Sequence, residues 1–562
     1  MTPDALDWDV LQERSLAWAK ERWHWVVLIA LSVWMYLVRM RPFGNFYRDD
    51  GIFFIGTDPY YHARHVVYTV ANFPSTLGYD ALTQYPLGTD PGQFGTLFDQ
   101  GAALLAWIAG ILVDGGAPSQ ETTMAVFVAY PAILGALTVF AVYALARRLV
   151  SRGPALFAAL IIALLPGEFL VRSLAGYVDH HVMEALLSTL AMATLLWALQ
   201  RWEASGVTLQ GIVDAPKGLL DPERRGAWLA TALAALAFTA YLWTWPSGVL
   251  FIGIVGLWLV VQAGWDVARA REIAPLLITV AGTFLPLALL MVLRVDRAGF
   301  TALTYSWMQP VAALGVALAA VAIAALAWVW HVRELPPPWY PGALAGGALL
   351  GLGAIQVLLP RLLSQVLSGL SWVTGIGVQR TRLTIAEAQP ATFAEMSGEF
   401  GLLFWTAMFG FGLVVINALR KHKASDTLLI LWAVLMTSAT LTQVRFIYYL
   451  AVVVAVLNGE LAVGHVIVPA SAVRDEGTSY HYLAPSREVA ATPAAVAAIE
   501  RTLGKDNVDY VVGKTWTTDA IYRETPGKIA LRRQEGCLTV EMEAAAFFAV
   551  ARFREVTVGQ IL

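Results

Sequence analysis

The chain has 562 residues, of which 58% are hydrophobic and 14% are charged. A soluble domain has no core large enough for that much apolar surface, so the composition excludes an ordinary soluble fold and predicts a polytopic membrane protein. The net charge of −3, with no basic stripe, indicates no nucleic-acid partner. A single cysteine, Cys537, excludes an intramolecular disulfide and a cysteine-based zinc site.

Apolar windows long enough to cross roughly 30 Å of hydrocarbon recur along the chain as far as residue 464. They predict about twelve transmembrane helices, at 24–40, 123–146, 154–171, 182–200, 226–245, 248–264, 273–294, 307–331, 341–359, 401–419, 427–442 and 446–464. One further apolar stretch, 97–113, is ambiguous by composition alone.

The basic residues of the short loops orient these helices, because Lys and Arg favour the cytoplasmic side of a membrane. Those at 147–152, 224–225, 269–271 and 420–423 fall on one side only if 97–113 does not cross. We therefore expect 97–113 to be a helix within an outer loop. The N-terminus then lies inside, and the first helix acts as an uncleaved signal anchor.

Four short polar patches fall on the outer side of this topology. They are Asp58 to His62, Asp179 to His181, Thr384 to Glu387, and Arg445 to Tyr449. Each patch alone is a weak signal, because an exposed carboxylate is usually just solvated. Their convergence on one face predicts an acidic, metal-binding site at a bilayer surface.

The residue types of this site favour a hard divalent cation. Carboxylates with an imidazole are suitable ligands for Mg²⁺ or Mn²⁺, which pair with phosphate oxygens, so a pyrophosphate is the natural guest. Asp179 and His181 are two residues apart, and in an extended segment their side chains share one face. Asp58 and Glu387 could complete the ligand set from other loops.

Three further features near these patches have less specific interpretations. His62 and His65 lie one helical turn apart, and we interpret them as interfacial histidines near head groups rather than as a second metal site. The aromatic cluster at 243–246 is typical of anchors at the membrane interface, and we assign it no chemistry. Arg445 begins the last span, where it either reaches the head groups or receives an acidic group of a substrate.

Taken together, the motifs resemble the catalytic subunit of oligosaccharyltransferases, the asparagine-glycosylating membrane enzymes. The resemblance rests on GTDPYYHAR at 56–64, RSLAGYVDHHVME at 172–184, TIAE at 384–387 and QVRFIYY at 443–449. It extends over residues 20–460, and the DHH form of the second motif is most similar to archaeal members. It implies an all-α, GT-C-like membrane domain over residues 1–464.

The resemblance also implies an activity and the roles of individual residues. The family is a metal-dependent, inverting glycosyltransferase that moves an oligosaccharide from a polyprenyl (pyro)phosphate lipid to Asn in an Asn-X-Ser/Thr acceptor polypeptide. By position, Asp58, Asp179, His181 and Glu387 match its Mn²⁺ or Mg²⁺ site, and Asp58 and Glu387 also hold the acceptor carboxamide. Arg172 matches a basic residue that supports this centre. Arg445 matches the residue that contacts the acceptor peptide.

The chain departs from the family after the last predicted span. The family's outer domain carries a Trp-Trp-Asp-Tyr-Gly motif that binds the sequon Ser/Thr, and this pentapeptide does not occur here. We therefore expect a truncated transferase in the cell membrane, with its active face outside and the segment after 464 in the cytoplasm.

Residues 465–562 have a different, polar composition and predict a small α/β fragment, with a strand-like run at 508–513 and a helix-like run at 540–553. The segments 472–480, 513–519 and 535–545 resemble the C-terminal half of a uridine or purine nucleoside phosphorylase. In that family Met542 and Glu543 would contact the ribose. A chimeric or misassembled junction near 458–466 is a simpler explanation of this join than an evolved bifunctional protein.

Two other functions remain open at this point. One is a membrane-tethered nucleoside phosphorylase fragment, which the tail favours. The other is a multi-span transporter, which many spans with an intramembrane charge network would suit. The ionisable residues nevertheless cluster in outer loops rather than at mid-depth, which favours the transferase.

Overall fold

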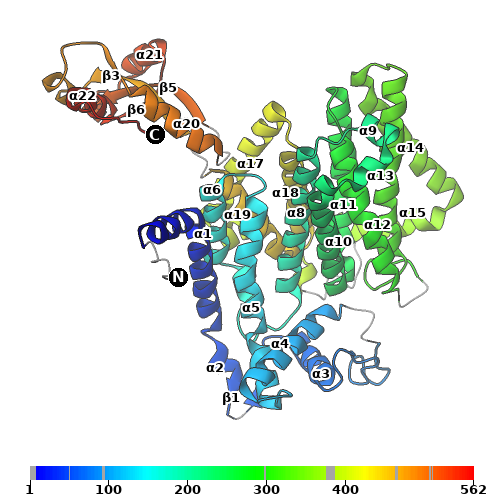
Figure 1. Cartoon of the computed structure of the whole chain (residues 1–562). Coiled ribbons are helices and arrows are strands. Elements are labelled where there is room, and N and C mark those ends of the chain that lie inside the picture. Colours follow the sequence, from blue (N-terminus) through cyan, green and yellow to red (C-terminus); the bar gives the residue numbers. More distant parts are fainter. Residues whose placement is uncertain are drawn as a thin grey trace, which may run out of the picture. The chain divides into compact units, whose positions relative to one another are not determined.

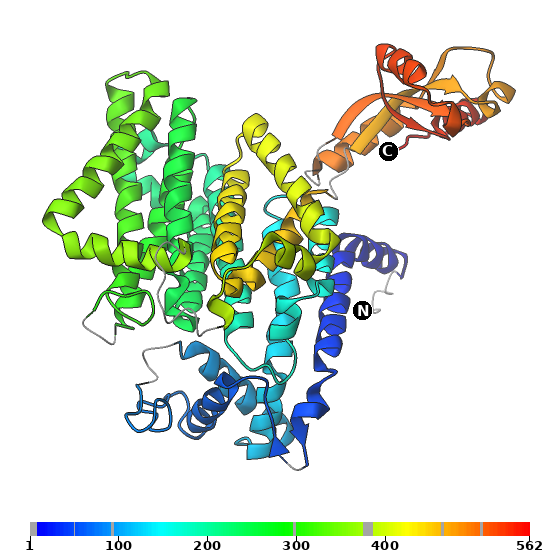
Figure 2. The same ribbon diagram turned by 180° about the vertical axis from the view of Figure 1, so that it is seen from behind.

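The computed structural model describes residues 8–49, 51–90, 95–295, 299–374, 386–461, 466–505, 508 and 510–562. It divides into two compact units, Met1–Ala462 and Val463–Leu562. The first is a helical membrane unit and the second is a small α/β unit (Figures 1 and 2).

The membrane unit is built from long apolar helices. Within the described residues, 11 segments are long and apolar enough to cross a membrane. The first of them begins at Arg22, within α1 (Trp8–Met40). The others contain the helices α5 (Gln120–Ala146), α8 (His181–Ala204), α10 (Arg225–Thr244), α11 (Val249–Ala268), α12 (Ala274–Val292), α13 (Met308–Val332), α14 (Tyr340–Leu358), α17 (Leu402–Lys421), α18 (Ala424–Thr442) and α19 (Ile447–Leu461). The polytopic helical fold predicted from composition is therefore confirmed.

The span predicted at 154–171 is not one continuous helix. The chain forms α6 (Arg152–Leu164), which has 13 residues, and then the short α7 (Glu168–Arg172). Pro166 and Gly167 separate the two, and Gly167 has a φ of +83°, which a helix cannot contain. Tyr130 of α5 contacts Met183 at the start of α8, and Arg148, which follows α5, contacts Gln200 near the end of α8. The two helices therefore run in the same direction, and α6 and α7 return the chain across the unit between them.

The outer-loop stretch 97–113 forms the helix α4 (Leu97–Val113), one of the shorter apolar helices rather than a candidate span. It packs against α3 (Asp58–Ala71), which begins at Asp58 with Pro59 in its first turn. Proline is favoured there because the first amides of a helix have no intrahelical acceptor. The start of α3 therefore places the first polar patch at the same end of the unit as the beginning of α8 (Figure 1).

The second unit contains a four-stranded sheet in the order β4-β3-β5-β6. Its strands are β3 (Val466–Asp475), β4 (Glu488–Ala490), β5 (Tyr510–Thr518) and β6 (Cys537–Glu541), and its helices are α20 (Pro493–Lys505), α21 (Pro526–Gln534) and α22 (Ala544–Arg554). β3, β5 and β6 are parallel, and β4 is antiparallel to β3. The helix expected at 540–553 begins later than predicted, because Val540 and Glu541 extend the sheet.

Arg474 is a buried cation in the core of this unit, with 2% exposure. Its guanidinium donates to Ser479 Oγ at 2.7 Å, to Ser486 Oγ at 2.8 Å and to the Ala484 carbonyl at 2.8 Å. It also lies over the Tyr480 ring at 4.1 Å. These contacts fix the segment between β3 and β4.

We expect Arg474→Met to lower the free energy of unfolding of this unit by about 3–5 kcal/mol, because several charge-assisted hydrogen bonds are lost and their buried acceptors are left unpaired. Hydrogen exchange of the full-length protein should show the loss of protection over residues 466–490. Arg501→Met, an exposed position on α20, serves as the control. Unchanged exchange in the Arg474 variant would contradict this account.

Candidate functional site

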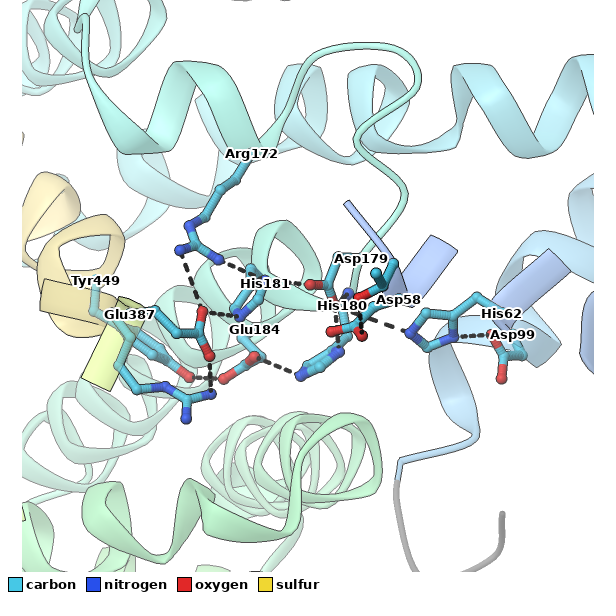
Figure 3. Close-up of polar contacts among 12 residues, drawn as sticks. Asp58, His62, Asp99, Arg172, Asp179, His180, His181, Glu184, Glu387 and Tyr449 are labelled. Carbon is cyan, nitrogen blue, oxygen red and sulfur yellow. Dashed lines mark hydrogen bonds and ion pairs between the residues drawn. The ribbon is translucent and has the colours of Figure 1, made fainter. Parts of the chain in front are cut away.

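The polar patches meet at one end of the membrane unit, because four elements begin or end there. Asp179 precedes the first turn of α8, and Asp58 begins α3. Arg445 lies in the turn between α18 and α19. Glu387 lies in a 3-10 turn over Ala386–Ala388. Figure 3 shows the side chains of Asp58, Asp179 and Glu387 gathered around the histidines at this end of the unit.

Asp179 is buried and lies between two histidines. Its Oδ1 is 2.6 Å from Nδ1 of His180 and also accepts the His180 backbone N–H at 2.6 Å. Its Oδ2 is 2.8 Å from Nδ1 of His181. Although burial opposes ionisation, the two imidazoles hold the pKa of Asp179 well below its usual range. Burial likewise opposes the charged His180, but Asp179 raises the pKa of His180 to about 9. The site therefore keeps an ionised carboxylate at its centre.

Glu387 lies between two arginines. Its Oε2 is 3.3 Å from Nη2 of Arg172, and its Oε1 is 3.5 Å from Nη2 of Arg445. Burial raises the pKa of the carboxyl, but Arg445, followed by His181 and Arg172, produces a net lowering. The sequence predicts that Arg445 either reaches the head groups or receives an acidic group of a substrate. In the structure its guanidinium pairs with Glu387, an acidic side chain of the protein itself.

His181 connects the two carboxylates. Its Nε2 is 3.6 Å from Glu387 Oε2, and its Nδ1 lies 2.8 Å from Asp179 and 2.9 Å from Nη1 of Arg172. One ring nitrogen cannot donate to Asp179 and accept from Arg172 at the same time. The ring is therefore held in place from both sides without a unique tautomer.

Asp58 is the one predicted ligand that is exposed. Its carboxylate accepts a hydrogen bond from the neighbouring Thr57 hydroxyl at 3.4 Å, and Figure 3 places it beside Asp179 and His180. The structure thus brings Asp179, His181 and Glu387 into direct contact, with Asp58 at the edge of the group. Thr384 and Ile385 of the third patch lie outside the described residues.

The interpretation of His62 and His65 as interfacial head-group histidines is wrong. Both are buried, with exposures of 2% and 7%. His62 Nδ1 is 2.6 Å from Asp99 Oδ1, and its Nε2 is 3.9 Å from Asp179 Oδ1. His65 contacts Asp99 at 3.2 Å and Asp80 at 3.3 Å. The signal that was missed is the pairing of α3 with α4, which turns the histidine face of one helix toward an acid of the other.

A second carboxylate that sequence reasoning did not use lies at the floor of the site. Glu184 is 1% exposed, accepts a hydrogen bond from the Tyr449 hydroxyl and lies 3.3 Å from Nε2 of His180. Tyr449 in turn is 2.8 Å from the Tyr241 hydroxyl. The spacing of His180 and Glu184, four residues apart at the start of a helix, was the available signal.

The aromatic cluster at 243–246 also takes part in this site. The ring of Trp245 stacks on His180 with centroids 4.5 Å apart, and Arg445 lies 5.3 Å from the centre of the same indole. The indole therefore contacts both the His180 ring and the Arg445 guanidinium.

The donor set fits a divalent cation. Among the described residues, ligand atoms gather within 4.8 Å of one another in two groups, His62–Asp179–His180 and His180–His181–Glu184. Nε2 of each of the three histidines is buried and makes no hydrogen bond with the described residues. Buried nitrogens that make no hydrogen bond are uncommon, and imidazole with carboxylate is a common environment for divalent transition metals.

In the second unit, Met542 and Glu543 follow the carboxyl end of β6 and are exposed. The Glu543 backbone amide donates to a carboxylate oxygen of Glu541 at 2.7 Å, and Glu543 is the N-cap residue of α22. Ligands of parallel sheets bind at this edge, where the carboxyl ends of the strands meet.

Comparison with known proteins agrees with the geometry. Residues 26–458 match the family described as oligosaccharyl transferase STT3, N-terminal. The chain is 30% identical over 519 residues to the dolichyl-monophosphooligosaccharide–protein glycotransferase AglB of Haloferax volcanii, covering 79% of this chain and 48% of that protein. The chain thus spans about half the length of the curated relatives it matches.

Two solved structures have the same fold. The oligosaccharyltransferase AglB from Archaeoglobus fulgidus, in complex with an inhibitory peptide and a dolichol phosphate, has a TM-score of 0.68 and 26% identity and covers 79% of this chain and 50% of that one. The oligosaccharyltransferase of the same organism in complex with Zn and sulfate has a TM-score of 0.62 and 25% identity and covers 78% of this chain and 49% of that one.

The C-terminal segment is similar to a different class of protein. Residues 453–562 match the phosphorylase superfamily. Over 107 residues this segment is 34% identical to guanosine phosphorylase of Halorubrum lacusprofundi, covering 19% of this chain and 44% of that protein. The resemblance of the tail to a nucleoside phosphorylase is therefore confirmed.

The match over 26–458 covers most of the chain, and it shows that this protein belongs to the oligosaccharyl transferase STT3 family.

Proposed function

We propose that the membrane unit transfers an oligosaccharide from a polyprenyl (pyro)phosphate lipid to the Asn of an Asn-X-Ser/Thr acceptor polypeptide. The observation that carries this proposal is the buried Asp179–His181 pair joined to Glu387 at one end of the membrane helices, with Arg172 bridging them. An acidic centre at this end of the membrane helices can face a lipid-linked phosphate on one side and a peptide on the other.

Asp58, Asp179, His181 and Glu387 would hold Mn²⁺ or Mg²⁺. When bound, the cation would supply positive charge against the departing phosphate. The presence of His181, with His62 and His180 close by, favours Mn²⁺, because imidazole is a better ligand for transition metals than for Mg²⁺. The (pyro)phosphate lipid would approach from the membrane side of this group.

The acceptor amide needs activation, since its nitrogen lone pair is conjugated with the carbonyl. Asp58 and Glu387 would each accept one N–H of the carboxamide, which weakens this conjugation and directs the nitrogen toward the anomeric carbon. Attack on the face opposite the leaving phosphate inverts the configuration. Arg172 and Arg445 keep Glu387 ionised for this role, and Arg445 at the edge would also contact the acceptor peptide.

By the positive-inside rule, this site would face the outside of the cell membrane, and the segment after the last span would be cytoplasmic. We assign residues 1–464 to the transferase and 465–562 to a partial phosphorylase-like segment. In that segment Met542 and Glu543 would contact a nucleoside ribose, which is favoured by their position at the carboxyl edge of β6.

The test is a transfer assay. A dolichyl phosphate oligosaccharide and a fluorescent Asn-X-Thr peptide are incubated with the membrane protein, once with Mn²⁺ and once with EDTA. Glycopeptide formation that requires Mn²⁺, and that disappears when Gln replaces the acceptor Asn, supports the proposal. Glycopeptide formed equally well in EDTA would contradict the metal assignment.

We expect Asp99→Asn to weaken Mn²⁺ binding about 10–100-fold, the usual effect of losing a group that orients a metal ligand. Asp99 contacts His62 at 2.6 Å and His65 at 3.2 Å, one through each carboxylate oxygen. In the asparagine variant an NH₂ donor replaces one of these two acceptor oxygens. Titration of the free Mn²⁺ paramagnetic resonance signal measures the affinity without catalysis. Asp114→Asn, an outer-loop carboxylate bonded to the Ser119 amide, is the control, and equal affinities in the two variants would overturn the prediction.

A further inference from the structure

A polar cavity of about 380 Å³ lies at the end of the membrane unit opposite the candidate site. Its walls come from the C-terminal ends of α8 and α11 and from the turn between α17 and α18. The candidate site lies instead at the beginning of α8. The volume falls within the range of small-ligand pockets, which is roughly 300–1,000 Å³.

The floor of this cavity offers hydrogen-bond acceptors. Gln262 and Asp266 lie one turn apart on α11, with exposures of 1% and 8%. The Gln262 amide nitrogen donates to Asp266 Oδ2 at 2.9 Å, an orientation that is chemically required because a carboxylate accepts only. The Gln262 Oε1 is therefore turned away from Asp266, is buried, and has no hydrogen-bond partner among the described residues. A ligand that donates an N–H or O–H at this point would satisfy it.

The rim of the cavity is mainly basic. Arg148, Arg271, Lys421 and Lys423 line it, and three of these four side chains are exposed. Of the two rim carboxylates, Glu272 is already engaged, since its Oε1 accepts the backbone amides of residues 209, 273 and 274. The other carboxylate belongs to Glu203 at the end of α8. A phosphate suits this rim, because the cations outnumber the acids.

We propose that this cavity binds the head group of a phospholipid, with the phosphate at the basic rim and a terminal N–H or O–H donor on the Gln262–Asp266 floor. The rim lies where α8, α11 and α17 end, which is the depth at which a bilayer presents its phosphates. A soluble phosphate compound shares part of this chemistry, and the experiment separates the two sources. The inference is independent of the proposed transferase activity.

Native mass spectrometry of the full-length protein in detergent tests the proposal. Phosphatidylethanolamine, phosphatidylglycerol and phosphatidylcholine with identical acyl chains are titrated separately. The first two carry a terminal donor, whereas the choline group carries none. We expect the donor-bearing lipids to bind about fivefold more tightly than phosphatidylcholine, the factor that one hydrogen bond typically contributes. Equal binding of all three lipids would overturn the proposal, and so would inorganic phosphate that displaces them at the same concentration.

Two variants test whether the preference for donor-bearing lipids depends on the floor of the cavity. Gln262→Leu removes the unpaired acceptor and should abolish the preference over phosphatidylcholine, whereas Gln262→Glu keeps an acceptor and should retain it. Arg269→Gln is the matched control, because Arg269 lies over the Trp265 ring at 4.6 Å and does not line the cavity. A preference that persists in Gln262→Leu would refute the assignment. If that variant does not fold, the comparison of lipids on the unaltered protein decides.

Discussion

Asp58→Asn and Glu387→Gln are each expected to reduce glycan transfer by about 10²–10³-fold, the usual effect of removing a preorganised electrostatic contact from a transition state. Both substitutions keep the size of the side chain but remove the negative charge that would hold the amide and the cation. In Glu387→Gln the neutral amide also gives up its ion pairs with Arg172 and Arg445. Peptide binding should change far less than kcat, because other contacts hold the peptide.

The measurement uses the membrane unit extended by the remaining part of an archaeal relative, since this chain spans about half the length of those proteins. Turnover and peptide affinity are compared for the two variants and for Glu121→Gln, an exposed carboxylate in the first turn of α5. Unchanged turnover in both active-site variants would show that these carboxylates are merely solvated.

Asp179→Asn is expected to abolish Mn²⁺ binding, with an effect larger than the 10–100-fold typical of an outer-shell partner. Asp179 is 4% exposed and holds His180 at 2.6 Å and His181 at 2.8 Å, so the variant loses a ligand and also releases two imidazoles. An asparagine cannot accept from both rings as a carboxylate does. The remaining ligands would then lack a central anion.

Calorimetric titration with Mn²⁺ measures this effect in the chain as it stands. Asp221→Asn, an exposed acid in the loop between α9 (Leu209–Asp214) and α10, is the control. A midpoint within threefold of the unaltered protein would place the metal elsewhere and remove Asp179 from the ligand set.

The parts of the candidate site whose residues are close together in the sequence could be predicted from their motifs. The contacts that depend on how separate helices pack were harder to predict. Asp179 and His181 could be paired from their spacing, and Glu387 from its motif. His62 was misread because its role depends on Asp99, which lies on another helix 37 residues later in the chain. Trp245 was assigned no chemistry because a tryptophan at a helix end is usually an interfacial anchor.

The sequence by itself determined the membrane class of this protein and predicted that the polar patches gather on one side of the bundle, because hydropathy and loop charge depend on composition within each segment. The tertiary structure decided which side chains meet. Pro166 and Gly167 were visible in the sequence, but only packing shows that α6 and α7 still carry the chain across. The Asp99–His62 contact and the Glu184–Tyr449 contact join residues from different helices, and such contacts depend on the relative rotation of the helices, which no local pattern encodes.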